Sequence, residues 1–100
     1  MVKHIILWTL KDEYSADEKK EIKKNIKTAL EALGGKIPGL LEIKVDIDGL
    51  SSSTADLMLD SSFESEEALK GYSVNPIHVK AADTFVRPFT ANRSCLDFEI

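Results

Sequence analysis

The sequence predicts a small α+β domain whose elements follow in the order β, α, β, β, α, β. Three observations lead to this prediction: a β-branched run near the N-terminus, an amphipathic stretch that starts with helix-capping residues, and later segments in which apolar and polar residues alternate. With 100 residues the chain has the length of one domain. We therefore take residues 1–100 as a single folding unit.

The first strand and the first helix come from the N-terminal third of the chain. Residues 2–10 read VKHIILWTL, and β-branched and aromatic residues are typical of a strand covered on both faces. Ser15 stands three residues before Glu18, the spacing of a capping box. Gly34 and Gly35 are expected to end the helix in the left-handed conformation. The apolar residues at helical intervals between them are Ile22, Ile26, Ala29, Leu30 and Leu33.

Two alternating segments then predict a β-hairpin. From residue 41 to residue 48, apolar side chains alternate with Glu, Lys and Asp, so one face of this strand should be dry. The alternation stops at Gly49, and the Ser-rich stretch 50–54 is typical of a turn. Residues 55–63 alternate again and predict the third strand.

The C-terminal third predicts two helices and a last strand. Ser65 and the two acids behind it favour a short helix to Tyr72, because acids stabilise the first turn. The pair Asn75–Pro76 offers an N-cap and a first helical residue, which predicts a helix to about Val86. Residues 95–100 alternate between apolar and acidic side chains and predict the fourth strand.

This order is the split βαβ or ferredoxin-like arrangement, a four-stranded antiparallel sheet with helices on one face. Ile5, Leu7 and Met58 should point to the other face, and no segment is left to cover them. We therefore expect a homodimer in which two sheets pack face to face as a barrel. The core expected beneath the helices comprises Ile6, Trp8, Leu41, Ile43, Leu57, Leu59, Leu96 and Phe98.

The net charge of the chain argues against some classes of binding partner. A net charge of −4 and a pI near 5.1 argue against nucleic acid and anionic membranes, which need clustered Lys and Arg. The lysines between residues 19 and 27 alternate with acids and indicate a solvated helix face. No apolar run is long enough to span a membrane, and no targeting signal is expected. The lone Cys95 cannot form an intrachain disulfide, so we expect a cytoplasmic protein and a passive cysteine without a charged activating neighbour.

Four side chains stand out as candidates for chemistry: His4, Trp8, Tyr72 and His78. Strand alternation places His4 on the face of Ile6 and Trp8, so its imidazole should point beneath the helices. Tyr72 ends one predicted helix and His78 begins the next, which could bring both rings to one cavity mouth. A phenol and an imidazole there can donate and accept a proton.

A plainer interpretation exists for each of these residues. A histidine on a strand can be a hydrogen-bonded core residue, and a tyrosine at a helix end can simply pack its ring. The motifs of zinc proteases, paired-cysteine sites, phosphate loops and nucleophile elbows are all missing. We therefore predict no cofactor and no metal site, although a surface Mg²⁺ held by carboxylates stays open. Residue types alone leave open whether the chain is an enzyme.

Several segments together resemble the stress-responsive dimeric α+β barrel (Dabb) family. They are VKHIILWTLKDE at the start, then IPG, FESEEALKGY and NPIHV, and CLDFEI at the end. The resemblance covers essentially the whole chain. It implies a ferredoxin-like protomer, a homodimer built through the sheets, and a cavity between sheet and helices.

Part of the chain is also similar to the plant polyketide cyclase branch of that family. This branch uses the tyrosine and the histidine of a Y-x5-H segment for proton transfer, and Tyr72 and His78 match those positions. The resemblance implies that, in a cofactor-free lyase or cyclase, these two would be catalytic, with His4 as a pocket histidine. Two departures argue against the cyclase substrate: Leu57 replaces a further pocket histidine, and Trp8 fills space for a long substrate tail.

These observations leave three hypotheses about function. In the first, an apolar pocket binds a small hydrophobic, keto or phenolic metabolite and presents it to Tyr72 and His78. In the second, the protein is a stress or assembly module without small-molecule chemistry. The third follows related dimeric barrels that oxidise quinols or bind haem, with His78 as axial ligand. The ligand-binding residues expected in the first are His4, Ile6, Trp8, Leu57 and Leu59.

Overall fold

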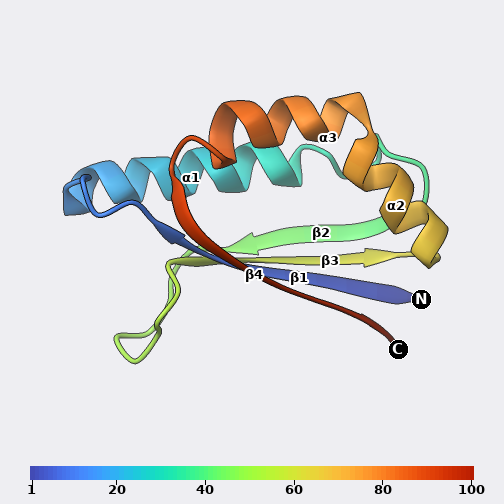
Figure 1. The fold of residues 1–100 in the computed structure, drawn as a ribbon, viewed down its shortest axis with the longest axis horizontal. Helices are drawn as coiled ribbons and strands as arrows, with labels where there is room; N and C mark the ends of the chain where they lie inside the picture. Colours follow the sequence, from blue (N-terminus) through green and yellow to red (C-terminus); the bar gives the residue numbers. More distant parts are fainter.

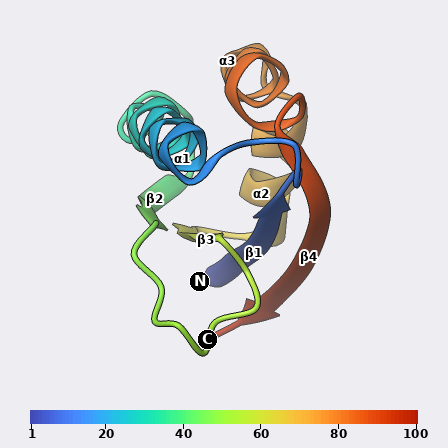
Figure 2. The same cartoon turned by 90° about the vertical axis from the view of Figure 1, so that its left-hand side faces the viewer.

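The computed structural model of the protein describes residues 1–100 and shows one antiparallel sheet with all helices on a single face (Figures 1 and 2). The strand order in this four-stranded sheet is β2-β3-β1-β4. This confirms the predicted ferredoxin-like arrangement. The strands are β1 (Val2–Leu10), β2 (Leu40–Asp46), β3 (Leu57–Phe63) and β4 (Thr90–Glu99). The helices are α1 (Ala16–Glu31), α2 (Glu66–Val74) and α3 (Pro76–Ala81), and α3 continues as a π-helical segment, η1 (Ala82–Val86).

Helix α1 begins with the predicted capping box. Oγ of Ser15 accepts a hydrogen bond from the backbone N–H of Glu18 (3.1 Å), and Oε1 of Glu18 accepts one from the backbone N–H of Ser15 (2.8 Å). Two otherwise unpaired backbone donors are thereby satisfied. The helix ends at Glu31, earlier than expected, and the left-handed residue behind it is Gly35 alone (φ 78°).

Side-chain caps also set the junction that positions the candidate site. Oγ of Ser65 accepts from the backbone N–H of Ala68 (3.1 Å) at the start of α2. Oδ1 of Asn75 accepts from the backbone N–H of Ile77 (2.9 Å) at the start of α3. Because Asn75 ends one helix and begins the next, the last turn of α2 adjoins the first turn of α3.

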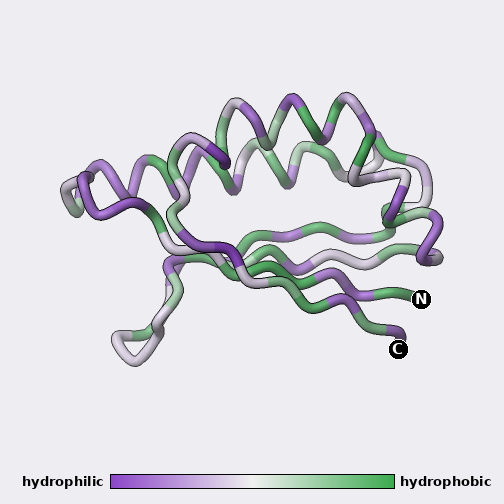
Figure 3. The backbone as a smooth tube through the Cα atoms, viewed as in Figure 1, coloured by the Kyte–Doolittle hydropathy of each residue, from purple (hydrophilic) through white to green (hydrophobic).

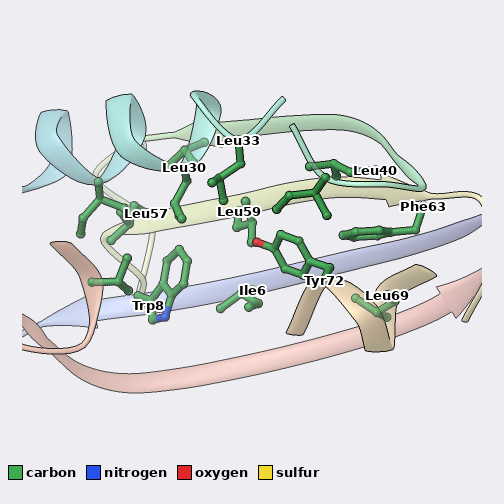
Figure 4. Close-up of a cluster of buried hydrophobic side chains, with 14 of the residues drawn as sticks. Ile6, Trp8, Leu30, Leu33, Leu40, Leu57, Leu59, Phe63, Leu69 and Tyr72 are labelled. Atoms are coloured by element: carbon green, nitrogen blue, oxygen red, sulfur yellow. The ribbon is translucent and has the colours of Figure 1, made fainter. Parts of the chain in front are cut away.

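The core lies between the sheet and the helices (Figure 4). Ile6, Trp8, Leu57 and Leu59 are buried as predicted, and Ile43 is partly buried against them. Figure 3 shows hydrophobic residues along the strands, whereas α1 alternates between hydrophilic and hydrophobic residues. The chain therefore presents one apolar stripe of α1 to the sheet.

The predicted inward position of Leu41 is wrong. The pairing of β2 with β3 slips between Leu40 and Glu42, as in a β-bulge, and this slip changes which residues face the helices. Leu41 is 48% exposed, and Leu40 takes the buried place at 9% exposure. The alternation resumes after the slip, so Val45 is fully buried.

The predicted inward position of Leu96 and Phe98 on β4 is also wrong. Leu96 pairs with Ile5 of β1, and Phe98 pairs with Lys3, so both side chains lie on the face away from the helices. They are 63% and 39% exposed. The strand also starts earlier than expected, at Thr90. The opposite set of β4 residues faces the helices.

The sheet face away from the helices carries an apolar patch, which we call the outer patch. Its residues are Ile5, Leu7, Met58, Leu96 and Phe98, related by the pairs Ile5↔Leu96 and Leu7↔Met58. Figure 2 shows no helix on this side of the sheet. The structure thus confirms that the chain's own helices leave the second face of the sheet uncovered. Among the helices, none has the length and apolar character needed to cross a lipid bilayer.

Candidate functional site

A cavity of about 110 Å³ lies between the sheet and the helix junction. The structure brings most of the predicted site residues to it, namely His4, Ile6, Trp8, Leu59, Tyr72 and His78. Leu57 does not line this cavity, and it is buried in the core at 3% exposure. Trp8 lines the wall of this cavity and does not fill it.

Tyr72 and His78 meet at this cavity because the α2–α3 junction places them on adjoining turns. Their ring centroids are 4.1 Å apart and the ring planes are tilted by 33°. Figure 4 shows the Tyr72 hydroxyl directed away from α2, toward the space between Ile6 and Leu59. Both the Tyr72 hydroxyl and Nδ1 of His78 are buried without a hydrogen-bond partner. The Tyr72 hydroxyl is thus free to bind a ligand, whereas the backbone of Ser73 lies close enough to the His78 imidazole to act on its pKa.

The surroundings keep both groups neutral at neutral pH. Burial raises the pKa of Tyr72, and nearby Arg93 offsets only part of this shift. Burial lowers the pKa of His78 below its usual value, and Arg87 is among the positive groups that act in the same direction. The phenol is therefore protonated and can donate a hydrogen bond, and the imidazole can accept a proton.

His4 belongs to a second hydrogen-bonded group beside the cavity. Its Nδ1 donates to Oδ1 of Asp97 over 2.5 Å, and its ring lies edge-on to Tyr72 with the centroids 6.1 Å apart. Because a carboxylate only accepts hydrogen bonds, Asp97 orients the His4 ring with a proton on Nδ1. His4 is 6% exposed, as the strand alternation predicts.

Cys95 lies beside this pair. Its Sγ is 3.4 Å from Oδ1 of Asp97 and 3.8 Å from Nδ1 of His4. Asp97 is thus a charged neighbour, but a carboxylate does not activate a thiol. Ligand atoms of the three residues lie within 4.8 Å of one another and are of kinds that bind metal ions. Burial raises the pKa of the Cys95 thiol, and Asp97 adds to this shift. The thiol form donates to Asp97 and is the weaker metal ligand, since metals bind the thiolate.

The cavity does not suit a haem. The isolated cavity that admits benzene in another protein measures about 150 Å³, and this one measures about 110 Å³. A porphyrin is several times the size of benzene. His78 at this wall therefore has no room for an axial haem, and the residues present do not fit that group.

Sequence reasoning missed the polar residues that β4 and the segment before it contribute. Arg87, Thr90 and Arg93 line the cavity, and Asp97 holds His4. The signal was the alternation of β4 itself, which separates Arg93, Cys95, Asp97 and Glu99 from the apolar residues between them. From the sequence we expected Leu96 and Phe98 in the core, so we expected the polar residues of β4 to face solvent.

Comparison with known proteins gives the same fold. The model of the family described as "Stress responsive A/B Barrel Domain" matches residues 2–100. A dimeric protein of unknown function with a ferredoxin-like fold from Bacteroides fragilis is 32% identical, with a TM-score of 0.91 over 99% of this chain and 95% of that one. No curated protein matches the chain.

Two further structures extend this comparison. A dimeric ferredoxin-like protein of unknown function from Thermobifida fusca is 26% identical, with a TM-score of 0.81 over 99% of this chain and 90% of that one. A hydroxynitrile lyase from Passiflora edulis is 19% identical, with a TM-score of 0.72 over 99% and 92%. The likeness to the lyase is one of fold alone.

Proposed function

Because the chain belongs to the stress responsive A/B barrel domain family, we propose that it is a homodimeric metabolite-binding protein of that family. In this proposal the cavity of each protomer binds a small keto or phenolic compound, and Tyr72 and His78 move a proton on it. The proposal treats residues 1–100 as one domain and places it in the cytoplasm.

One observation carries the chemical part of this proposal. Tyr72 and His78 line the same cavity, and the Tyr72 hydroxyl and Nδ1 of His78 are buried without a hydrogen-bond partner. Leaving a buried polar group unpaired costs about 1–3 kcal/mol. A ligand oxygen or an acidic ligand hydrogen at this place would recover that free energy, which favours ligand binding here over packing alone.

The two groups have complementary roles in proton transfer. His78 accepts a proton from a carbon next to the ligand's carbonyl group, so the C–H bond breaks and its electron pair moves to the carbonyl oxygen. The Tyr72 hydroxyl donates a hydrogen bond to the resulting enolate oxygen. Return of the proton from His78 completes the cycle without net oxidation. Asp97 orients His4 on the neighbouring wall.

The size of the cavity limits the ligand. A cavity of about 110 Å³ holds a group no larger than a benzene ring, which another protein binds in about 150 Å³. The ligand is therefore a small molecule or the reactive end of a larger one. Ile6, Trp8 and Leu59 supply the apolar part of the wall.

The dimer in this proposal is built through the outer patch. The chain's own helices cover only the opposite face, and apolar patches on a sheet face favour association. Relatives from Bacteroides fragilis and Thermobifida fusca are described as dimeric. An isologous contact between two such patches would close a barrel.

The test follows ligand binding and proton transfer separately. Trp8 is the only tryptophan and lines the cavity, so its fluorescence reports binding of acetylacetone or phenol. Proton abstraction is measured as deuterium incorporation into acetone in D₂O by NMR. We expect wild-type protein to quench and to speed exchange above buffer. His78→Ala should abolish exchange, and Tyr72→Phe should reduce it about tenfold or more.

Results that contradict the proposal are equally defined. Unchanged Trp8 fluorescence across the panel, together with exchange at the buffer rate, would leave Tyr72 and His78 as packing residues. His78→Ala would then lower the melting temperature and change nothing else. The non-catalytic module is favoured by one observation, the 4.1 Å ring stacking that fixes the helix junction without any ligand.

A further inference from the structure

The cavity is basic although the chain is acidic. The protein has 17 Asp and Glu against 13 Lys and Arg, yet no Asp or Glu lines the cavity. Its charged and titratable lining residues are Arg87 and Arg93, with His4, His78 and Tyr72. Cations elsewhere in the protein form ion pairs with carboxylates, whereas the cavity wall contains no carboxylate.

Arg93 is the cation that lacks a carboxylate. It pairs with Trp8 in the sheet register, so its side chain lies on the cavity side of β4. None of the ion pairs in the protein includes Arg93, whereas Arg87 binds Asp83 one helical turn away. One guanidinium at the cavity is therefore left uncompensated.

The positive charge of Arg93 affects the pKa values of Tyr72 and His78. Arg93 acts to lower the pKa of both Tyr72 and His78, and Arg87 acts in the same direction on His78. Arg93, Tyr72 and His78 also line the same cavity of about 110 Å³. An anion bound at Arg93 in this cavity would therefore lie beside Tyr72 and His78.

We propose that the ligand carries a carboxylate held by Arg93 and a keto oxygen held by Tyr72, which makes it a small keto acid. The inference rests on the function proposed above and specifies its substrate class. A guanidinium offers two parallel N–H donors that match the two oxygens of a carboxylate. A single uncompensated cation suits a singly charged group better than a phosphate, and the cavity size favours a compact acid.

The experiment compares two probes that differ only in charge. Pyruvate carries the carboxylate, and pyruvamide replaces it by a neutral amide of nearly the same shape. Binding is followed by Trp8 fluorescence and by calorimetry, with inorganic phosphate as a third probe. We expect pyruvate to bind about tenfold or more tightly than pyruvamide, and the difference to shrink as salt screens the charge.

Variants assign the difference to one residue. Arg93→Gln should reduce the affinity for pyruvate to about that for pyruvamide, and it should weaken pyruvamide binding much less than pyruvate binding. Arg93→Lys keeps the charge without the planar fork and should fall between the two. Lys36→Gln makes the same change in net charge at an exposed site outside the cavity and should leave the preference intact.

Each other outcome points to a different failure. Equal binding of pyruvate and pyruvamide would overturn the carboxylate assignment and leave the proposed keto-binding function standing. Phosphate binding tighter than pyruvate would overturn the assignment in favour of another oxyanion. If neither pyruvate nor pyruvamide binds, and acetylacetone and phenol do not change Trp8 fluorescence either, both the proposed function and this inference are wrong.

Discussion

Nδ1 of His4 and Oδ1 of Asp97 are 2.5 Å apart, although these residues lie 93 positions apart in the chain. The contact exists because β1 and β4 are antiparallel neighbours and His4 pairs with Asp97 in their register. A buried imidazole donor is thereby satisfied by a carboxylate from the edge strand. The arrangement joins the two ends of the chain at the wall of the cavity.

Removal of this carboxylate should destabilise the protein. Asp97→Ala leaves the His4 donor buried and unpaired, which costs about 1–3 kcal/mol. At roughly 4–8 °C per kcal/mol for a domain of this size, the melting temperature should fall accordingly. Glu99→Ala is the matched control, since Glu99 is the next residue on the same side of β4 and is exposed. Equal effects of the two variants would mean that the His4–Asp97 bond adds no stability.

Tyr72→Phe should leave the free energy of unfolding unchanged or raise it by up to about 1 kcal/mol, because it removes a buried hydroxyl without a partner. The ring, which packs in the core, is retained. Urea unfolding measures this difference. Ligand affinity and proton exchange should fall in the same variant. A clear loss of stability would show that the hydroxyl has a structural partner.

Stability should decline on acidification through His78. Burial lowers the pKa of this imidazole in the folded protein, so the unfolded chain, with a pKa near about 6.5, binds more protons. The free energy of unfolding is therefore highest above pH about 6.5 and falls as the pH drops below it. His78→Asn should reduce this decline between about pH 7 and pH 5.5.

A charge in the outer patch should produce monomers. Leu96→Lys places an ammonium group among the apolar side chains that we propose are buried between two sheets, where an unpaired charge is costly. Sedimentation velocity at micromolar concentration measures the shift from dimer to monomer. Val74→Lys, at a position 76% exposed on α2, should leave the dimer intact. A wild-type protein that is already monomeric would refute the dimer.

The register slip in β2 buries Leu40 and leaves the adjacent Leu41 exposed. Leu40 is 9% exposed and Leu41 is 48% exposed. Leu40→Ala should therefore cost about 2–5 kcal/mol, whereas Leu41→Ala in an isolated protomer should stay within about 0.5 kcal/mol. Thermal unfolding of the two variants measures the contrast. Equal losses would place both side chains in the core.

Local patterns determine the types and order of the elements in this protein. The capping box at Ser15 and the cap at Asn75 act through hydrogen bonds to residues two or three positions away, so they can be read without tertiary contacts. The same holds for the place of Tyr72 and His78 on either side of one helix junction. Strand alternation likewise suffices to place His4, Ile6 and Trp8 on one face of β1.

Tertiary structure decided which face each edge strand presents. In β4 the apolar and polar sets both alternate with period two, so the pattern alone fits either orientation. Pairing with the central β1 selects the orientation that turns Arg93 to the cavity, Asp97 to His4 and Leu96 to the outer patch. The slip at Leu40 is likewise a matter of pairing between strands. The alternation along a strand shows which residues share a face. Only contacts with other strands and helices decide which of the two faces lies in the core.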